Sequence, residues 1–213
     1  MPAYHVLDLS SSQMLMLNIA LLALLGLGLL HGERRLEDGR RLALLGLLAL
    51  FGIAGRVLLA PLPNIQPVTL IVLLAGMHLG ARHSILLAAV IALGSNLILG
   101  HGIWTLYQAL GWSLVGCLGA LLASRQDSIS TLLVAAALSG FLFDFVVSLS
   151  ILHAVGPESL LPYLVAGLPY DLLHAAGNVT FAAWMGAPLA EMMRRHNLSE
   201  LSLEAGEGVT SPA

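Results

Sequence analysis

The sequence predicts an all-α membrane protein of about seven transmembrane helices, with no soluble domain of any size. Of its 213 residues, 58% are hydrophobic and 10% are charged, and the mean hydropathy is +0.89. A soluble domain carries roughly 25% charged residues, so this chain has too little polar surface to cover a globule in water. Apolar stretches recur along almost the whole chain, which indicates repeated membrane crossings.

Most of the predicted helices approach the roughly 20 residues needed to cross a hydrocarbon core about 30 Å thick. They cover residues 13–30, 42–60, 67–81, 84–99, 105–124, 131–153 and 169–192. The third and fourth are shorter, so we expect them to be tilted, irregular at their ends or sheltered by neighbouring helices.

The first apolar segment could instead be a signal peptide. Its leading flank contains Asp8 but neither Lys nor Arg, and no small-residue cleavage site follows it. We therefore expect a retained helix, which with the Arg-rich loop after it forms an N-terminal unit, 1–41. A six-helix core, 42–193, follows, and the acidic, small-residue-rich segment 194–213 is expected to be a disordered cytoplasmic tail.

Eight of the nine arginines lie in alternate loops, and the chain contains no lysine. They follow the first, third, fifth and seventh predicted helices, at Arg34, Arg35, Arg40, Arg41, Arg82, Arg125, Arg194 and Arg195. The opposite loops, 61–66, 100–104 and 154–161, contain no arginine. Because cytoplasmic loops are enriched in Arg and Lys, this pattern predicts an outside N-terminus and a cytoplasmic C-terminus in the cell (inner) membrane.

Polar residues, which are costly inside a bilayer, gather toward the predicted outer side. In the proline-rich turn 61–69, Asn64 and Gln66 offer amide donors and acceptors. The segment 96–112 carries Asn96, Gln108, a glycine on each side of residue 101 and the aromatic residues Trp104, Tyr107 and Trp112. These rings could stack on a flat ligand, or they could form an interfacial aromatic belt beside a glycine turn.

A third polar cluster opens the last predicted helix, where Pro169 suits a helix N-terminus and Asp171 would complement the helix dipole. Asp171, His174 and Asn178 are spaced i, i+3 and i+7, so they share one helical face. We expect this face to be turned toward the bundle, either as a hydrogen-bonded seam between helices or as a ligand contact.

Two residues with formally charged side chains, Arg56 and Asp144, lie inside other predicted helices. A buried carboxyl at Asp144 must be protonated or paired, and Arg56 is the only arginine within a predicted span. Arg56 could serve a pocket or extend its side chain to the membrane surface.

The sequence has no Walker motif, no pair of metal-binding histidines at helical spacing and no nucleophile turn. Its single cysteine, Cys117, excludes a disulfide framework, and its net charge of −3 offers no basic surface for nucleic acid. We therefore expect no enzymatic activity, no cofactor and no metal site. Energised transport would need a separate ATPase or an ion gradient.

Four segments together resemble the substrate-binding membrane subunit, the S component, of energy-coupling factor (ECF) transporters. They are Arg56–Thr69, Asn96–Trp112 and Gly167–Asn178, with weaker support from Gly140–Asp144. The resemblance spans Leu42–Met192 and implies a six-helix core that captures a vitamin or cofactor precursor from outside. It also implies partners, namely a transmembrane coupling protein and cytoplasmic ATPase subunits.

The sequence departs from this family at its N-terminus and in its first core helix. It has an additional N-terminal helix, and small residues recur at every third position, at Ala43, Gly46, Ala49, Gly52 and Gly55, instead of an Ala-x-x-x-Ala docking pattern. Such a row still permits close helix approach. The chain also lacks the Met-His start of the cobalt and nickel members, so a metal-ion substrate is not expected.

The predicted ligand site combines residues from all three polar clusters. It consists of Arg56, Asn64, Gln66, Asn96, Trp104, Tyr107, Gln108, Asp171, His174 and Asn178. These residue types suit a partly flat, amide- or ring-bearing vitamin-type molecule. The alternative is a self-sufficient, proton-coupled secondary transporter with Asp144, Asp171 and His174 as a proton relay, although no inverted repeat of helices is visible.

Overall fold

Long apolar runs with few internal breakers fold into helices, which prolines and glycines separate. The computed structural model of the protein describes Met16 and residues 39–207. Within these residues the chain consists of helices and short turns, without a strand. The first predicted helix, 13–30, lies outside the described residues apart from Met16, so the count of seven helices stays a prediction.

The five helices predicted between residues 42 and 153 are all present, with ends that differ by a few residues. They are α2 (Gly39–Leu58), α3 (Val68–Leu79), α4 (Ala81–Leu99), α5 (Trp104–Leu121) and α6 (Ile129–Ser148). Short helical turns, η1 (Ala123–Arg125), α7 (Ile151–Ala154) and η2 (Pro157–Ser159), join the longer helices, and the last helix is α8 (Leu160–Glu207). Gly80 and Gly100 allow the tight connections after α3 and α4, because both have a positive φ that side chains disfavour.

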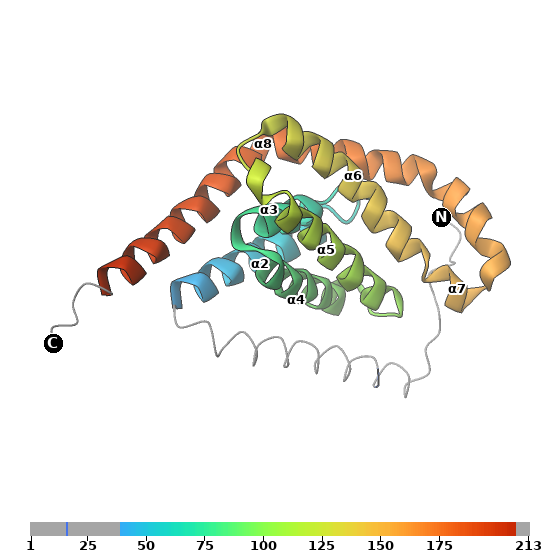
Figure 1. Cartoon of the computed structure of the whole chain (residues 1–213). Helices are drawn as coiled ribbons and strands as arrows, with labels where there is room; N and C mark the ends of the chain where they lie inside the picture. The colour runs from blue at the N-terminus through green and yellow to red at the C-terminus, as the bar shows by residue number, and fades with distance from the viewer. Residues whose placement is uncertain (1–15, 17–38, 208–213) are drawn as a thin grey trace.

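The last helix differs from its prediction at both ends. It begins at Leu160 rather than at residue 169, so Pro169 lies inside the helix and Asp171 is not near its N-terminus. An internal proline is tolerated where neighbouring helices accommodate the missing hydrogen bond. Two internal prolines, Pro169 and Pro188, are consistent with the curved course of α8, which lies over α6 in Figure 1.

The predicted disorder of the tail 194–213 is wrong for its first part, because α8 remains helical through Glu207. Leucine, glutamate and alanine recur between residues 198 and 207, and these residues have high helix propensity. Continuation from an existing helix also avoids the unfavourable nucleation step.

Besides an apolar core, the molecule buries several polar side chains and exposes many large apolar ones, which is unusual for a soluble protein. Leu50, Leu97, Leu121 and Trp184 are 65–81% exposed, whereas Arg56 is 6% exposed. Among the described residues, three segments are long and apolar enough to cross a membrane: Arg41–Leu58, Ala81–Leu99 and Ile129–Ala154. The exposed apolar surface and the buried polar groups are together typical of a protein surrounded by lipid.

The shortest of the main helices, α3, lies at the centre of the bundle and packs against α2, α4, α5, α6 and α8. Val68–Ala75 is at most 1% exposed. Glycines bring α3 and α5 into backbone contact: a Cβ at Gly76 would lie 2.1 Å from the Gly116 carbonyl oxygen, and one at Gly119 would lie 2.2 Å from that of Leu73. This small-residue crossing is common between membrane helices.

The two ends of the bundle differ in composition. The end formed by the C-termini of α2, α4 and α6 and the N-termini of α3 and α5, here called the polar end, holds hydrogen-bonded side chains from all of these helices. At the other end, the arginine end, Arg41 and Arg82 lie near His83, and Arg194 lies near Asp127. The predicted grouping of arginines opposite the polar clusters is thus present in the described helices.

Candidate functional site

Arg56 organises one hydrogen-bond network at the polar end, here called the Arg56 network. It extends from the last turn of α2, and its Nη1 donates to Asn96 Oδ1 at 2.6 Å and to the Ser95 hydroxyl, both in the last turns of α4. Its Nε donates to Gln66 Oε1 at 3.2 Å, from the turn before α3. The alternative that Arg56 extends to the membrane surface is wrong, because the side chain is buried.

Asn96 continues this network into α5. Its Nδ2 donates to Thr105 Oγ1 at 2.8 Å and to Gln108 Oε1 at 2.7 Å. The oxygen of the Asn96 amide therefore accepts a hydrogen bond from α2, and its nitrogen donates hydrogen bonds to α5. Both polar atoms of the side chain have partners. Gly100 ends α4 and so lets the chain turn directly into α5 beside it.

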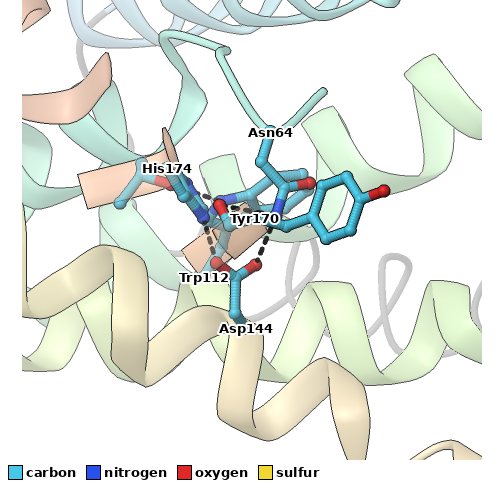
Figure 2. Close-up of polar contacts among 6 residues, drawn as sticks. Asn64, Trp112, Asp144, Tyr170 and His174 are labelled. Atoms are coloured by element: carbon cyan, nitrogen blue, oxygen red, sulfur yellow. Dashed lines mark hydrogen bonds and ion pairs between the residues drawn. The ribbon is translucent and has the colours of Figure 1, made fainter. Parts of the chain in front are cut away.

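A second network, here called the His174 network, joins α3, α5, α6 and α8 (Figure 2). Trp112 Nε1 donates to Thr69 Oγ1 at 3.1 Å, and Thr69 Oγ1 lies 2.9 Å from His174 Nε2. His174 Nδ1 lies 2.9 Å from Asp144 Oδ2, and both side chains are buried. Asp144 thus pairs with a histidine on α8 and not with Arg56.

The directions of these hydrogen bonds follow from the donors present. Trp112 can only donate, so Thr69 accepts from it, and the Thr69 hydroxyl is then free to donate to His174 Nε2. His174 Nδ1–H then donates to the Asp144 carboxylate.

Asn64 closes the His174 network at the chain turn before α3. Its Nδ2 donates to Asp144 Oδ1 and to the Tyr170 carbonyl oxygen, both at 3.4 Å. Its φ of 58° lies in the left-handed region, which asparagine tolerates better than most residues. The turn therefore presents Asn64 to α6 and α8.

The indole of Trp112 connects the two networks. The Arg56 guanidinium carbon lies 5.2 Å from the centre of this ring, a cation–π geometry. Phe143 stacks against the ring at 4.5 Å and meets His174 edge-on at 5.4 Å. The stacked rings of Trp112 and Phe143 therefore contact Arg56 on one side and His174 on the other network's side.

The structure brings six of the ten predicted site residues into these networks. They are Arg56, Gln66, Asn96 and Gln108 in the first and Asn64 and His174 in the second. Sequence reasoning missed the hydroxyls of Thr69, Ser95 and Thr105 as network members. Their signal was weak, since each is a small polar residue inside an apolar helix.

Four predicted residues lie outside the networks. The Trp104 ring covers Gly102, where an added Cβ would lie 2.0 Å from it, so the indole fills the space that this glycine leaves. Tyr107 OH lies 3.1 Å from His153 Nδ1 at an exposed position. Asp171 is half-buried and interacts electrostatically with Asp144 and His174 without a hydrogen bond to either.

Asn178 is 1% exposed, and neither polar atom of its amide has a hydrogen-bond partner among the described residues. It packs beside Gly140 at the α6–α8 interface, where an added Cβ would lie 3.1 Å from Asn178 Nδ2. The shared face predicted for Asp171, His174 and Asn178 does turn inward, but only His174 joins a network.

In the described part of the chain, no group of three or more His, Cys, Asp or Glu side chains is placed to hold a metal ion. The hydroxyls, amides, guanidinium and imidazole of the two networks are suited to hydrogen-bonding an organic molecule.

No curated protein and no solved structure matches the chain. A family model does match, over residues 37–200, which include α2 to α7 and most of α8 but not the predicted first helix, 13–30. The protein therefore belongs to a family of unknown function, DUF6580.

Proposed function

We propose that the protein is the substrate-binding membrane subunit of an ECF-type importer and captures a small vitamin-type molecule at the polar end. The observation that supports this most is the convergence of polar side chains from six helices on one end of an apolar bundle. The contributors include Arg56, Thr69, Asn96, Thr105, Asp144 and His174. Because polar groups are expensive at membrane depth, such a concentration marks a functional site more often than a packing device.

The chemistry of the Arg56 network favours ligand binding. Gln66 is hydrogen-bonded to Arg56, and Asn96 to Gln108. These three amides can exchange such bonds for hydrogen bonds to a ligand. Gln66 and Gln108 are half-buried and so lie at the boundary of the network. A ligand with a ring and hydrogen-bonding edges fits these groups and the nearby Trp112.

Uptake against a gradient would require a transmembrane coupling protein and ATPase subunits, because the sequence has no nucleotide-binding motif. The small residues of α2 offer a limited docking surface. Ala43 is exposed and Gly46 has open space around it, whereas Gly52 faces Ile91 and Gly55 faces Pro67. Spacing of three residues rotates around a helix, so the row does not form one face.

The proposed orientation in the cell (inner) membrane places the polar end outside and the arginine end in the cytoplasm. The grouping of Arg41, Arg82 and Arg194 opposite the polar end supports it. A ligand would then reach the Arg56 network from outside.

The direct test is to purify the full-length protein, extract any bound small molecule and identify it by mass spectrometry. We expect one organic compound in near-stoichiometric amount from the parent protein and from Cys117→Ala. Asn96→Leu and Gln108→Leu should each bind that compound about five- to 150-fold more weakly in a calorimetric titration, because the ligand loses a buried hydrogen-bond partner. Absence of a bound compound from the parent protein, or undiminished binding in both leucine variants, would contradict the proposal.

A self-sufficient proton-coupled transporter is the second candidate, and the His174 network favours it. Asp144, His174 and Thr69 form a buried hydrogen-bonded chain along which a proton could move. In liposomes that contain only this protein, such a transporter would accumulate the bound compound under a pH gradient. The ECF-type subunit would bind the compound but accumulate none without ATPase partners.

A further inference from the structure

The positive charge of Arg56 has no negative partner in the described part of the chain. All of its hydrogen-bond acceptors, Gln66, Ser95 and Asn96, are neutral, and its remaining close neighbour is the Trp112 ring. The acidic side chains in close contact with a basic or imidazole group among the described residues are Asp144, beside His174, and Glu191, beside two arginines. Asp144, the acidic member of the adjacent network, thus contacts His174 and not Arg56.

Such a charge is unfavourable where it lies. Arg56 is 6% exposed within a segment apolar enough to cross a membrane. A buried charge is normally paired, because neutral hydrogen bonds recover only part of the lost hydration. The protein therefore maintains an unneutralised cation at the centre of its most polar region.

The guanidinium also has unused donors. Nε and Nη1 donate to protein oxygens, whereas Nη2 makes no hydrogen bond to any described residue. Because Nη2 is not one of the fully enclosed side-chain nitrogens, the described residues leave part of its surface uncovered. Its two N–H groups can bind an oxygen atom without any change in the existing bonds of Arg56.

We infer that the ligand of this site carries a single carboxylate and that Arg56 Nη2 binds it. This inference rests on the proposed function, since it names the chemical class of the captured molecule. A carboxylate matches the donors of Arg56 in a charge-assisted hydrogen bond and neutralises its charge. The amides of Gln66 and Gln108 then recognise neutral parts of the same molecule.

The charge balance favours a monocarboxylate over a phosphate ester. A phosphate monoester carries a charge of about −1.5 to −2 at neutral pH, which exceeds the single charge of Arg56. Asp144 belongs to the neighbouring His174 network, and Asp171 interacts with it electrostatically. A surplus negative charge would be repelled by these carboxyl groups.

The test uses pairs of ring-bearing monocarboxylates and their amides, which differ in charge but hardly in shape. Suitable pairs are benzoate with benzamide, nicotinate with nicotinamide, and indole-3-acetate with indole-3-acetamide. Thermal unfolding of the purified full-length protein is followed as each probe is titrated. We expect at least one acid to stabilise the protein saturably, at about tenfold lower concentration than its amide.

Two arginine variants complete the experiment. Arg56→Gln should lose the preference for the acid, whereas Arg82→Gln, an exposed arginine at the other end, should keep it. If Arg56→Gln does not fold, Arg56→Lys is used instead, because it keeps the positive charge. The lysine variant should keep the preference for the acid but bind it more weakly. An amide as effective as its acid, no effect of any probe on the parent protein, or an undiminished preference in Arg56→Gln would overturn the inference.

The identity of the co-purified compound separates this inference from the proposed function. A bound neutral compound would uphold ligand capture and refute the carboxylate. If no compound co-purifies and no probe stabilises the protein, the proposed function itself fails.

Discussion

At the scale of single residues, the buried pair of Asp144 and His174 should be important for stability. Asp144→Ala leaves the Nδ1–H of His174 without its acceptor, and a buried donor left unsatisfied costs about 1–3 kcal/mol. We expect a large fall in the thermal unfolding midpoint of the purified protein. Glu191→Ala, which removes an exposed pair with Arg194 and Arg195, is the control and should change the midpoint little. Equal losses in both variants would contradict this assignment.

Replacement of Asn178, in contrast, should stabilise the protein. Its amide is enclosed at the α6–α8 interface without a hydrogen-bond partner among the described residues. Asn178→Leu has a similar shape and removes the unsatisfied groups, so the protein should become more stable by about 1–3 kcal/mol. Unfolding in denaturant measures this change. A marked destabilisation would mean that the amide binds a water molecule or part of the ligand, as its place in the predicted site suggests.

At the scale of elements, the crossing of α3 and α5 depends on glycine. Gly119→Ala would place a methyl group 2.2 Å from the Leu73 carbonyl oxygen, and a backbone oxygen cannot move without displacing the helix. We expect a loss of at least about 1–3 kcal/mol, measured by thermal unfolding. Gly46→Ala in α2 is the matched control, because nothing lies within 4 Å of the new methyl group. Its higher helix propensity should leave stability unchanged or raise it by about 0.5–1 kcal/mol.

At the scale of the whole molecule, the proposed orientation can be tested by labelling single cysteines in intact cells. In a Cys117→Ala background, Leu62→Cys at the polar end should react with a membrane-impermeant thiol reagent. Ser124→Cys at the arginine end should react only after the cells are permeabilised. Both positions are exposed, so access is limited by the membrane and not by the fold. The reverse labelling pattern would place the polar end in the cytoplasm.

How far the sequence predicts this molecule depends on the kind of feature. The helices α2 to α6 follow from apolar length and from breakers such as Pro61 and Gly100, which act locally. The start of α8 was predicted nine residues too late, at 169 instead of Leu160, because Pro169 was interpreted as a helix start. Proline fits both positions, and only the packing of neighbouring helices distinguishes them.

The partners of the polar residues were less predictable than their gathering at one end. Hydropathy and arginine placement indicate which end of each helix carries the polar groups. They do not determine the rotation of a helix about its axis, so the sequence placed Asp144 near His174 only in the proton-relay alternative and did not predict their direct hydrogen bond. The same limit explains why Trp104 and Tyr107 were expected in the ligand site but contact Gly102 and His153 instead.

The length of α3 has an electrical consequence. With 12 residues, α3 is about 18 Å long and cannot reach both surfaces of a hydrocarbon core about 30 Å thick. Arg56 and Asn96 lie two and three residues, or about 3 and 4.5 Å, below the ends of the flanking helices, α2 and α4. An anion bound there from outside would have crossed roughly one-tenth to one-seventh of the membrane field, at a cost of about 0.2–0.35 kcal/mol per 100 mV when the interior is negative. Collapse of the membrane potential should then tighten its binding about 1.5- to 1.8-fold, whereas a neutral ligand would be insensitive to voltage.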